Sequence, residues 1–187
     1  MKNIFLDCGA HKGESALMFL KRFKNSDIFV IHSFECNPSS IEKFKSVHKG
    51  NDKITLHEKA VWTHSAGLSF YLGESSGCST IKSKRSGNLD KNNPIFVESL
   101  SLSEFIKNNF DIEDNIILKI DIEGAEYEVL QDLIDTGTIK YIKQLFGEWH
   151  QHKIELPIDV HKKLIKSLSD EGLKMREWCA ITGVIGP

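Results

Sequence analysis

Short apolar runs alternate along this chain with segments in which apolar residues recur every three or four positions. The apolar runs, which are typical of buried strands, cover residues 4–7, 28–34, 53–62, 116–121 and 141–146. The segments with helical spacing cover residues 14–23, 38–47, 125–134 and 158–168. This alternation predicts an α/β fold in which a doubly wound, mostly parallel sheet is covered by helices on both faces.

The remaining segments are less regular. Residues 68–71 predict an extra hairpin or a bulged extension. Ser101 or Ser103 is a predicted cap for a short helix that ends at Asn109, and residues 173–185 predict one or two closing strands. Residues 73–93 are rich in Gly, Ser, Asn and Lys without periodicity, which predicts a flexible loop over the site. The length of 187 residues suits one core, so we expect a single domain over residues 1–187.

Charge and composition limit the kinds of partner that we expect for the chain. The chain has 24 basic and 26 acidic residues and a net charge of −2, so nucleic acid is not favoured. No apolar run approaches the roughly 20 residues of a membrane helix, and the first apolar run is too short for a signal peptide, which predicts a cytoplasmic protein without a membrane partner. Cys8, Cys36, Cys78 and Cys179 have neither CxxC nor zinc spacing, which indicates free thiols.

A glycine turn follows the first apolar run, in the sequence "LDCGAHKG" at residues 6–13. Gly9 allows a tight turn after Asp7, and Gly13 lets the next helix begin close to a ligand. Asp7 can meet a cationic amino group, and backbone N–H groups at the helix start can meet a carboxylate, so the turn suits a ligand with an amino-acid moiety. A dinucleotide site would have G-x-G-x-x-G, but His11 replaces its second glycine, so NAD and FAD are not favoured.

A second acid stands at the end of the next apolar run. In "HSFECNP", Glu35 follows the glycine turn by about 20 residues, where a carboxylate can accept hydrogen bonds from both hydroxyls of a ribose. The alternative is a solvated acid at the end of a strand. Asn37 is a predicted cap for the helix that Pro38 opens.

The chain closely resembles the FkbM family of S-adenosylmethionine (SAM)-dependent methyltransferases. The resemblance runs in order from about residue 3 to residue 150, through "LDCGAHKG", "FECNP", "EKAVW", "ILKIDIEGAEYEVL" and "GEWH". It implies a class I methyltransferase fold, with a Rossmann-like sheet of seven strands, the last of them antiparallel. It also implies SAM across the ends of the first strands and methyl transfer to oxygen, commonly to a hydroxyl on a sugar or other secreted metabolite.

The resemblance also implies roles for single residues. It assigns the methionine end to Asp7, Gly9, Ala10 and Gly13, the ribose to Glu35, the adenosine to Asn37 and the adenine to Ala60 and Val61. It places Asp121 and Glu123 opposite the transferred methyl group and the acceptor. The family often has Asn where His11 stands, so the role of His11 stays open.

Methyl transfer to an alcohol needs a base or a metal, because a hydroxyl is a poor nucleophile at neutral pH. Asp121, Glu148 and His150 are the candidate bases, and His150 has an unperturbed pKa of about 6.5. The same three residues, with Glu123, are also a candidate Mg²⁺ site, which is not favoured because the sequence gives ligand types without geometry. Two other groups are expected to be structural: Lys119 on the opposite face of its strand in a salt bridge, and Lys82, Lys84 and Arg85 on a solvated loop.

These residues favour a SAM-dependent O-methyltransferase that acts on a carbohydrate or a small glycosylated metabolite. One alternative is an RNA ribose 2′-O-methyltransferase that uses Lys12, Asp121 and Glu148, against which the nearly neutral charge argues. The other alternative is a non-catalytic SAM-binding protein, and the intact acids at the strand ends favour an enzyme instead.

Overall fold

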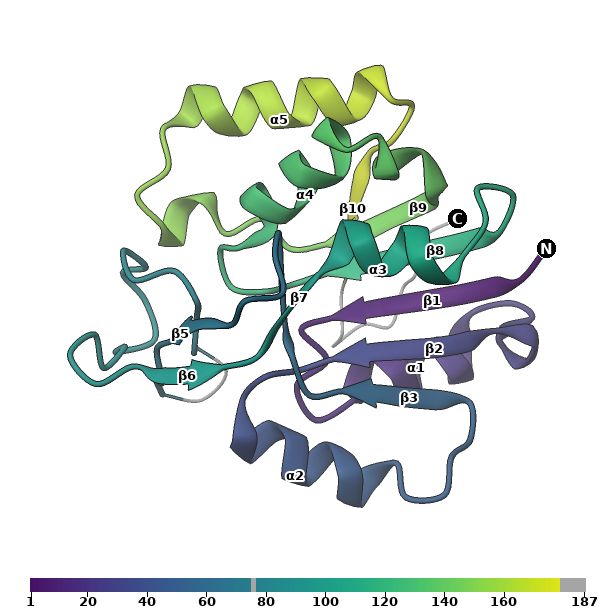
Figure 1. Ribbon diagram of the computed structural model, residues 1–187, viewed down its shortest axis with the longest axis horizontal. Helices are drawn as coiled ribbons and strands as arrows, with labels where there is room; N and C mark the ends of the chain where they lie inside the picture. Colours follow the sequence, from purple (N-terminus) through teal and green to yellow (C-terminus); the bar gives the residue numbers. More distant parts are fainter. Residues whose placement is uncertain (75–76, 179–187) are drawn as a thin grey trace.

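The computed structural model describes residues 1–74 and 77–178, which form a six-stranded sheet covered by helices on both faces (Figure 1). In spatial order the strands are β10 (Met175–Glu177), β9 (Ile142–Gly147), β8 (Asn115–Ile120), β1 (Asn3–Cys8), β2 (Val30–Phe34) and β3 (Ile54–His57). The helices are α1 (Glu14–Arg22), α2 (Pro38–Val47), α3 (Leu102–Asn109), α4 (Glu126–Asp135) and α5 (Ile158–Asp170), with 3₁₀ turns η1 (Ser26–Ile28), η2 (Thr138–Tyr141) and η3 (Gln151–Lys153). The predicted doubly wound α/β fold is confirmed.

The two faces of the sheet have separate apolar cores, because successive side chains of a strand point to opposite faces. Ile4 and Leu6 of β1 pack in the larger core cluster, which includes buried residues of α3, α4 and α5. Phe5 of the same strand packs on the other face against Phe19 of α1, with their ring centroids 4.1 Å apart. The order of the strands reverses between β1 and β8, which is the point where ligands bind in open α/β sheets.

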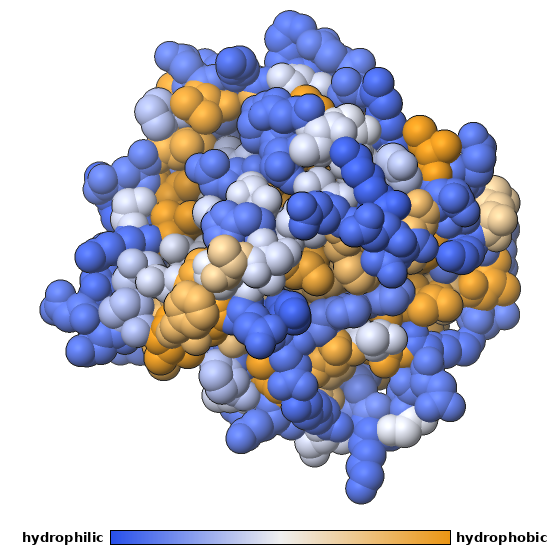
Figure 2. All heavy atoms as spheres, in the orientation of Figure 1, coloured by the Kyte–Doolittle hydropathy of each residue, from blue (hydrophilic) through white to orange (hydrophobic). Residues whose placement is uncertain are grey.

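Two small sheets lie beside the carboxyl ends of the main strands. In one, β4 (Ala60–Trp62) pairs in parallel with β7 (Ser99–Ser101), and in the other β5 (Leu68–Phe70) pairs antiparallel with β6 (Ile95–Val97). The predicted hairpin at residues 68–71 is this second pair, which encloses residues 71–94. Phe70 lines a cavity described below, whereas Phe96 is 73% exposed, and Figure 2 shows apolar side chains gathered over this pair.

Two strand boundaries differ from the prediction. The apolar run at residues 28–34 becomes a strand only at Val30, because residues 26–28 form η1. The run at residues 53–62 splits into β3 and β4, which belong to different sheets. Between them Glu58 and Lys59 form exposed ion pairs with other segments, so the chain leaves the main sheet at two charged residues.

The antiparallel last strand is not found at β10. This strand pairs in parallel with β9, because the chain reaches it through α5, and a helical crossover brings the next strand back in the same direction. Within the six-stranded sheet, all strand pairings of the described residues are parallel. The remainder of the predicted closing strands, at residues 179–185, lies outside the described residues.

Cys8, Cys36 and Cys78 have free thiols, as predicted, and Cys179 lies outside the described residues. Within residues 1–74 and 77–178, no helix has both the length and the apolar character needed to cross a bilayer.

Candidate functional site

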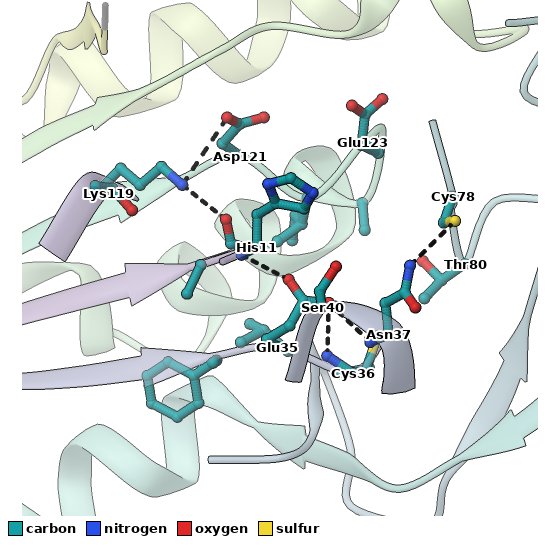
Figure 3. Close-up of a pocket in the computed structure, with 18 of the residues that line it drawn as sticks. His11, Glu35, Cys36, Asn37, Ser40, Cys78, Thr80, Lys119, Asp121 and Glu123 are labelled. Atoms are coloured by element: carbon teal, nitrogen blue, oxygen red, sulfur yellow. Dashed lines mark hydrogen bonds and ion pairs between the residues drawn. The ribbon is translucent and has the colours of Figure 1, made fainter. Parts of the chain in front are cut away.

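A cavity of about 550 Å³ opens at the carboxyl ends of β1, β2 and β8, beside the point where the strand order reverses. Its lining includes most of the residues that the sequence singled out: Gly9, Ala10, His11, Glu35, Asn37, Ala60, Val61, Asp121, Glu123 and Glu148. Three predicted site residues are not part of this lining, namely Asp7, Gly13 and His150. Figure 3 shows the two ends of the cavity, with Glu35 and Asn37 at one and Asp121 and Glu123 at the other.

Both glycines of the turn are required by close packing. Gly9 has φ +81°, and a Cβ there would lie 1.9 Å from the carbonyl oxygen of Asp121, so the ends of β1 and β8 touch at this residue. Gly13 has φ +86°, and its Cβ would lie 1.9 Å from Nε2 of His48, on α2's C-terminal side. We predicted glycine at position 13 because of a nearby ligand. In the structure, the residue that requires glycine there is His48.

Asp7 is fully buried beneath the turn and already has partners within the protein. It accepts a hydrogen bond of 2.5 Å from Oγ of Ser15, and its Oδ1 lies 3.2 Å from Nζ of Lys119. The cation beside Asp7 is thus the ammonium group of Lys119, where we had expected the amino group of a ligand. Asp7 holds the turn in place through Ser15 and Lys119.

Lys119 points to the opposite face from Leu118 and Ile120 and is salt-bridged, as predicted, but its partners belong to the site. Its Nζ donates to the carbonyl of Gly9 at 2.9 Å and lies 3.9 Å from Oδ2 of Asp121. Figure 3 marks the ion pair between Lys119 and Asp121. Burial lowers the pKa of Lys119, but the charges of Asp7 and Asp121 outweigh it and the net pKa is raised. The ammonium group therefore stays charged between the two acids.

Glu35 is held by backbone amides. Its Oε2 accepts from the N–H of His11 at 2.8 Å, and its Oε1 accepts from the N–H groups of Cys36 and Asn37 at 2.9 and 2.7 Å. Burial raises the pKa of Glu35, although these three hydrogen bonds oppose the shift. The role of His11 that the sequence left open is, at least through its backbone, to orient this carboxylate.

The neighbouring wall of the cavity is apolar. Ala60 and Val61 of β4 line it, and Ala60 belongs to a small core cluster with Phe70 and Cys78, which also face the cavity. Asn37 caps α2, as predicted, by accepting the N–H of Ser39 at 3.1 Å, and its Nδ2 donates to Sγ of Cys78 at 3.3 Å.

At the other end, Asp121 and Glu123 follow β8 in a tight loop that a buried glutamate holds. Glu123 has φ +57° and Gly124 has φ +113°, so the chain turns sharply between β8 and α4. The carboxylate of Glu126, fully buried at the start of α4, accepts the N–H groups of Ile122 and Gly124 at 2.8 and 2.9 Å. This loop presents both acids to the cavity.

His150 lies behind these acids and is fully buried. Its Nδ1 is 2.9 Å from Oε1 of Glu126, and its Nε2 faces carboxylate oxygens of Asp121, Glu123 and Glu148 at 3.8, 3.6 and 3.6 Å. Burial lowers the pKa of His150, but the hydrogen bond to Glu126 and the surrounding negative charges outweigh it, so the net pKa is raised. The structure thus brings the three candidate bases together with Glu123, and His150 lies behind the carboxylates.

Two further lysines approach these acids. Nζ of Lys84 lies 2.7 Å from Oε2 of Glu123 and donates to the carbonyl of Gly77 at 2.6 Å, and Nζ of Lys153 lies 3.3 Å from Oε1 of Glu148. Lys84 was expected on a solvated loop but is only 1% exposed, because residues 77–84 fold back onto the site. The flexibility of residues 73–93 stays a prediction.

Sequence reasoning missed Lys84, Lys153 and Glu126 as site residues. Glu126 had one local signal, since it follows Gly124 at the start of a helix, where an acid favours capping of the preceding turn. Lys84 had none, because its partner Glu123 is distant in sequence, and Lys153 lies five residues from Glu148 without a helical spacing that would predict the pair.

A family model described as the methyltransferase FkbM domain matches residues 7–175. No curated protein and no solved structure matches the chain.

Proposed function

The chain belongs to the FkbM methyltransferase family, and from this we propose that it is a SAM-dependent O-methyltransferase. Its acceptor is a hydroxyl of a carbohydrate or of a small glycosylated metabolite. The observation that carries the proposal is the carboxylate of Glu35, which three backbone amides aim into a cavity at the point of strand reversal.

The nucleoside of SAM fits the Glu35 end of the cavity. Oε2 of Glu35 has one amide partner and keeps a lone pair for a ribose hydroxyl, whereas Oε1 already accepts two N–H groups. The apolar wall formed by Ala60, Val61 and Phe70 suits an adenine ring beside that ribose. The methionine end of SAM then extends along Gly9 and Ala10 toward Asp121.

The reaction takes place where the methyl group meets the acids. The acceptor oxygen attacks the methyl carbon, an O–C bond forms, and the C–S bond breaks with its electron pair going to sulfur, which yields S-adenosylhomocysteine. The hydroxyl proton passes to Asp121, the acid that lines the cavity between Lys119 and His150. Glu123 and Glu148 accept hydrogen bonds from other hydroxyls of the acceptor, which suits a polyol.

No observation favours the other two functions. Lys12, which the RNA hypothesis needs, is not among the residues that line the cavity. A non-catalytic SAM-binding protein would not require the acids that gather beyond Glu35.

Incubation with methyl-labelled SAM and fractionated cellular extracts tests the proposal. We expect label in a small polar fraction, formed together with S-adenosylhomocysteine, and far less label with the Asp121→Asn variant. Label in RNA that is lost at high salt would support the RNA hypothesis. SAM binding without transfer to any fraction would support the non-catalytic one.

A further inference from the structure

The acids at the Asp121 end surround a nitrogen that has no hydrogen-bond partner among the described residues. This nitrogen is Nε2 of His150, whose side chain is fully buried. Ligand atoms of Asp121, Glu123 and His150 all lie within 4.8 Å of one another. A buried polar atom without a partner is costly, so the arrangement calls for a bound group.

Glu126 determines which nitrogen carries the proton. Its carboxylate accepts two backbone N–H groups and lies 2.9 Å from Nδ1 of His150. A carboxylate in this role only accepts, so Nδ1 carries the hydrogen and donates it to Glu126. In neutral His150, Nε2 then presents a lone pair to the surrounding carboxylates, which is unfavourable unless a cation lies between them. Carboxylate–histidine pairs of this kind orient metal ligands in many proteins.

The separations within this cluster suit a shared ion. Nε2 of His150 lies 3.8 Å from Oδ1 of Asp121 and 3.6 Å from Oε2 of Glu123, which is too long for hydrogen bonds. Two atoms that each lie about 2.1 Å from one ion are about 3.0 Å apart at a right angle and about 4.2 Å apart when they are opposite. Both separations fall within this range.

The charges around the cluster leave an excess of negative charge. Five carboxylates meet three ammonium groups here: Asp7, Asp121, Glu123, Glu126 and Glu148 against Lys84, Lys119 and Lys153. With neutral His150 the difference is two negative charges, which a divalent cation would balance.

We propose that Asp121, Glu123 and His150 bind a divalent first-row transition ion, with Mn²⁺ or Zn²⁺ as its representatives, and that Glu126 is a positioning residue for His150. An imidazole nitrogen with carboxylates suits these ions better than Mg²⁺, which prefers oxygen ligands alone. The site differs from the Mg²⁺ hypothesis drawn from the sequence in the kind of ion and in the omission of Glu148. The side chain of Glu148 is 52% exposed and pairs with Lys153.

The role of the ion rests on the proposed function. An ion at this position lies at the reacting end of the cavity, where it polarises the acceptor hydroxyl and lowers the pKa of that hydroxyl. Oδ2 of Asp121, which faces Lys119 rather than His150, remains to take the proton.

Binding of Mn²⁺ to the full chain, followed by electron paramagnetic resonance, tests the site without SAM. The six-line signal of free Mn²⁺ should disappear up to one ion per chain, and equimolar ZnCl₂ should restore it by competition. An unchanged signal with wild-type protein would overturn the proposal and leave His150 as an imidazolium among carboxylates. Restoration by equimolar MgCl₂ would overturn the choice of a transition ion.

Matched variants locate the ion. Asp121→Asn and Glu123→Gln, which keep side-chain size and lie on partly exposed side chains, should each weaken Mn²⁺ binding by at least about a hundredfold. Glu126→Gln should weaken it by about 10- to 100-fold, as outer-shell partners of metal ligands do. Glu155→Gln, on an exposed acid that pairs with Arg85, should leave it unchanged. Equal affinity in all four variants would overturn the proposal.

A parallel measurement of SAM binding separates the two claims. Mn²⁺ binding without SAM binding would contradict the proposed function and leave the metal site intact. SAM binding without Mn²⁺ binding would contradict only the metal site.

Discussion

The two ends of the cavity use carboxylates in different ways. At one end a single acid, Glu35, is held by three backbone amides beside an apolar wall. At the other end Asp121, Glu123 and Glu148 surround His150 and are approached by three lysines. The first arrangement suits the recognition of neutral hydroxyl groups, and the second suits the transfer of a proton. The proposed function therefore separates cofactor binding from chemistry along the cavity.

Asp121→Asn is the strongest way to break this separation. If Asp121 takes the proton, turnover of labelled SAM should fall by about 10²- to 10⁴-fold, because general-base catalysis contributes that much. The dissociation constant of SAM should be nearly unchanged, since the nucleoside lies at the other end. Glu155→Gln is the matched control and should keep full turnover. A large loss of SAM binding in Asp121→Asn, or full turnover, would contradict the separation of SAM binding at the Glu35 end from chemistry at the Asp121 end.

Lys119 joins the two strands beneath the cavity, and its loss should affect stability. Lys119→Met leaves Asp7 buried without its cation, so we expect unfolding free energy to fall by about 3–5 kcal/mol. Adding Asp7→Asn should recover part of that loss. Chemical denaturation measures both, with Lys166→Met as control: its exposed pair with Asp170 is worth no more than about 0.5 kcal/mol. Wild-type stability in Lys119→Met would contradict the assigned role.

Glu35→Ala tests the binding end. A hydrogen bond to a charged group contributes about 1.5–3 kcal/mol, so SAM should bind roughly ten- to a hundredfold more weakly. Turnover at saturating SAM should change much less, because the reacting end is intact. Calorimetry measures the affinity, and Glu42→Ala, on an exposed acid of α2, is the control. An unchanged affinity for SAM would contradict the ribose contact and support the alternative that Glu35 is only an acid at the end of a strand.

The pH dependence of SAM binding gives the smallest expected effect. Burial raises the pKa of Glu35 above the ordinary value of 4.5, and the ribose hydroxyls bind its ionised form. Affinity should therefore be highest above the raised pKa and fall by up to about tenfold per pH unit as the pH decreases through it. Calorimetry between pH 4 and about pH 8 should show this fall for wild type and a flatter profile for Glu35→Ala. Parallel profiles would assign the dependence to another group.

Features with a local cause could be predicted from the sequence. The alternation of apolar runs and helical spacing located β1, β8 and α2, and the position of Glu35 after its run placed it at the end of β2. Gly9 was identified as a turn residue, although the atom that requires it, the carbonyl oxygen of Asp121, lies on another strand.

Features that depend on distant partners could not be predicted. The pairs Lys84–Glu123 and Lys119–Asp7 join residues that are far apart in the chain. Strand alternation predicted a salt bridge for Lys119 but not its partners, and no local pattern marks Lys84. The direction of β10 follows from the crossover through α5 rather than from its own residues. The antiparallel last strand that the family resemblance implies stays a prediction, because residues 179–185 lie outside the described residues.

Calorimetry of the wild-type chain with SAM, S-adenosylhomocysteine and NAD tests the central claim most directly. If the cavity at the strand reversal is a SAM site, both SAM and its demethylated product should bind at one site per chain. NAD should not bind, because the turn at Gly9 and His11 lacks the dinucleotide pattern. Binding of NAD without binding of SAM would contradict the account.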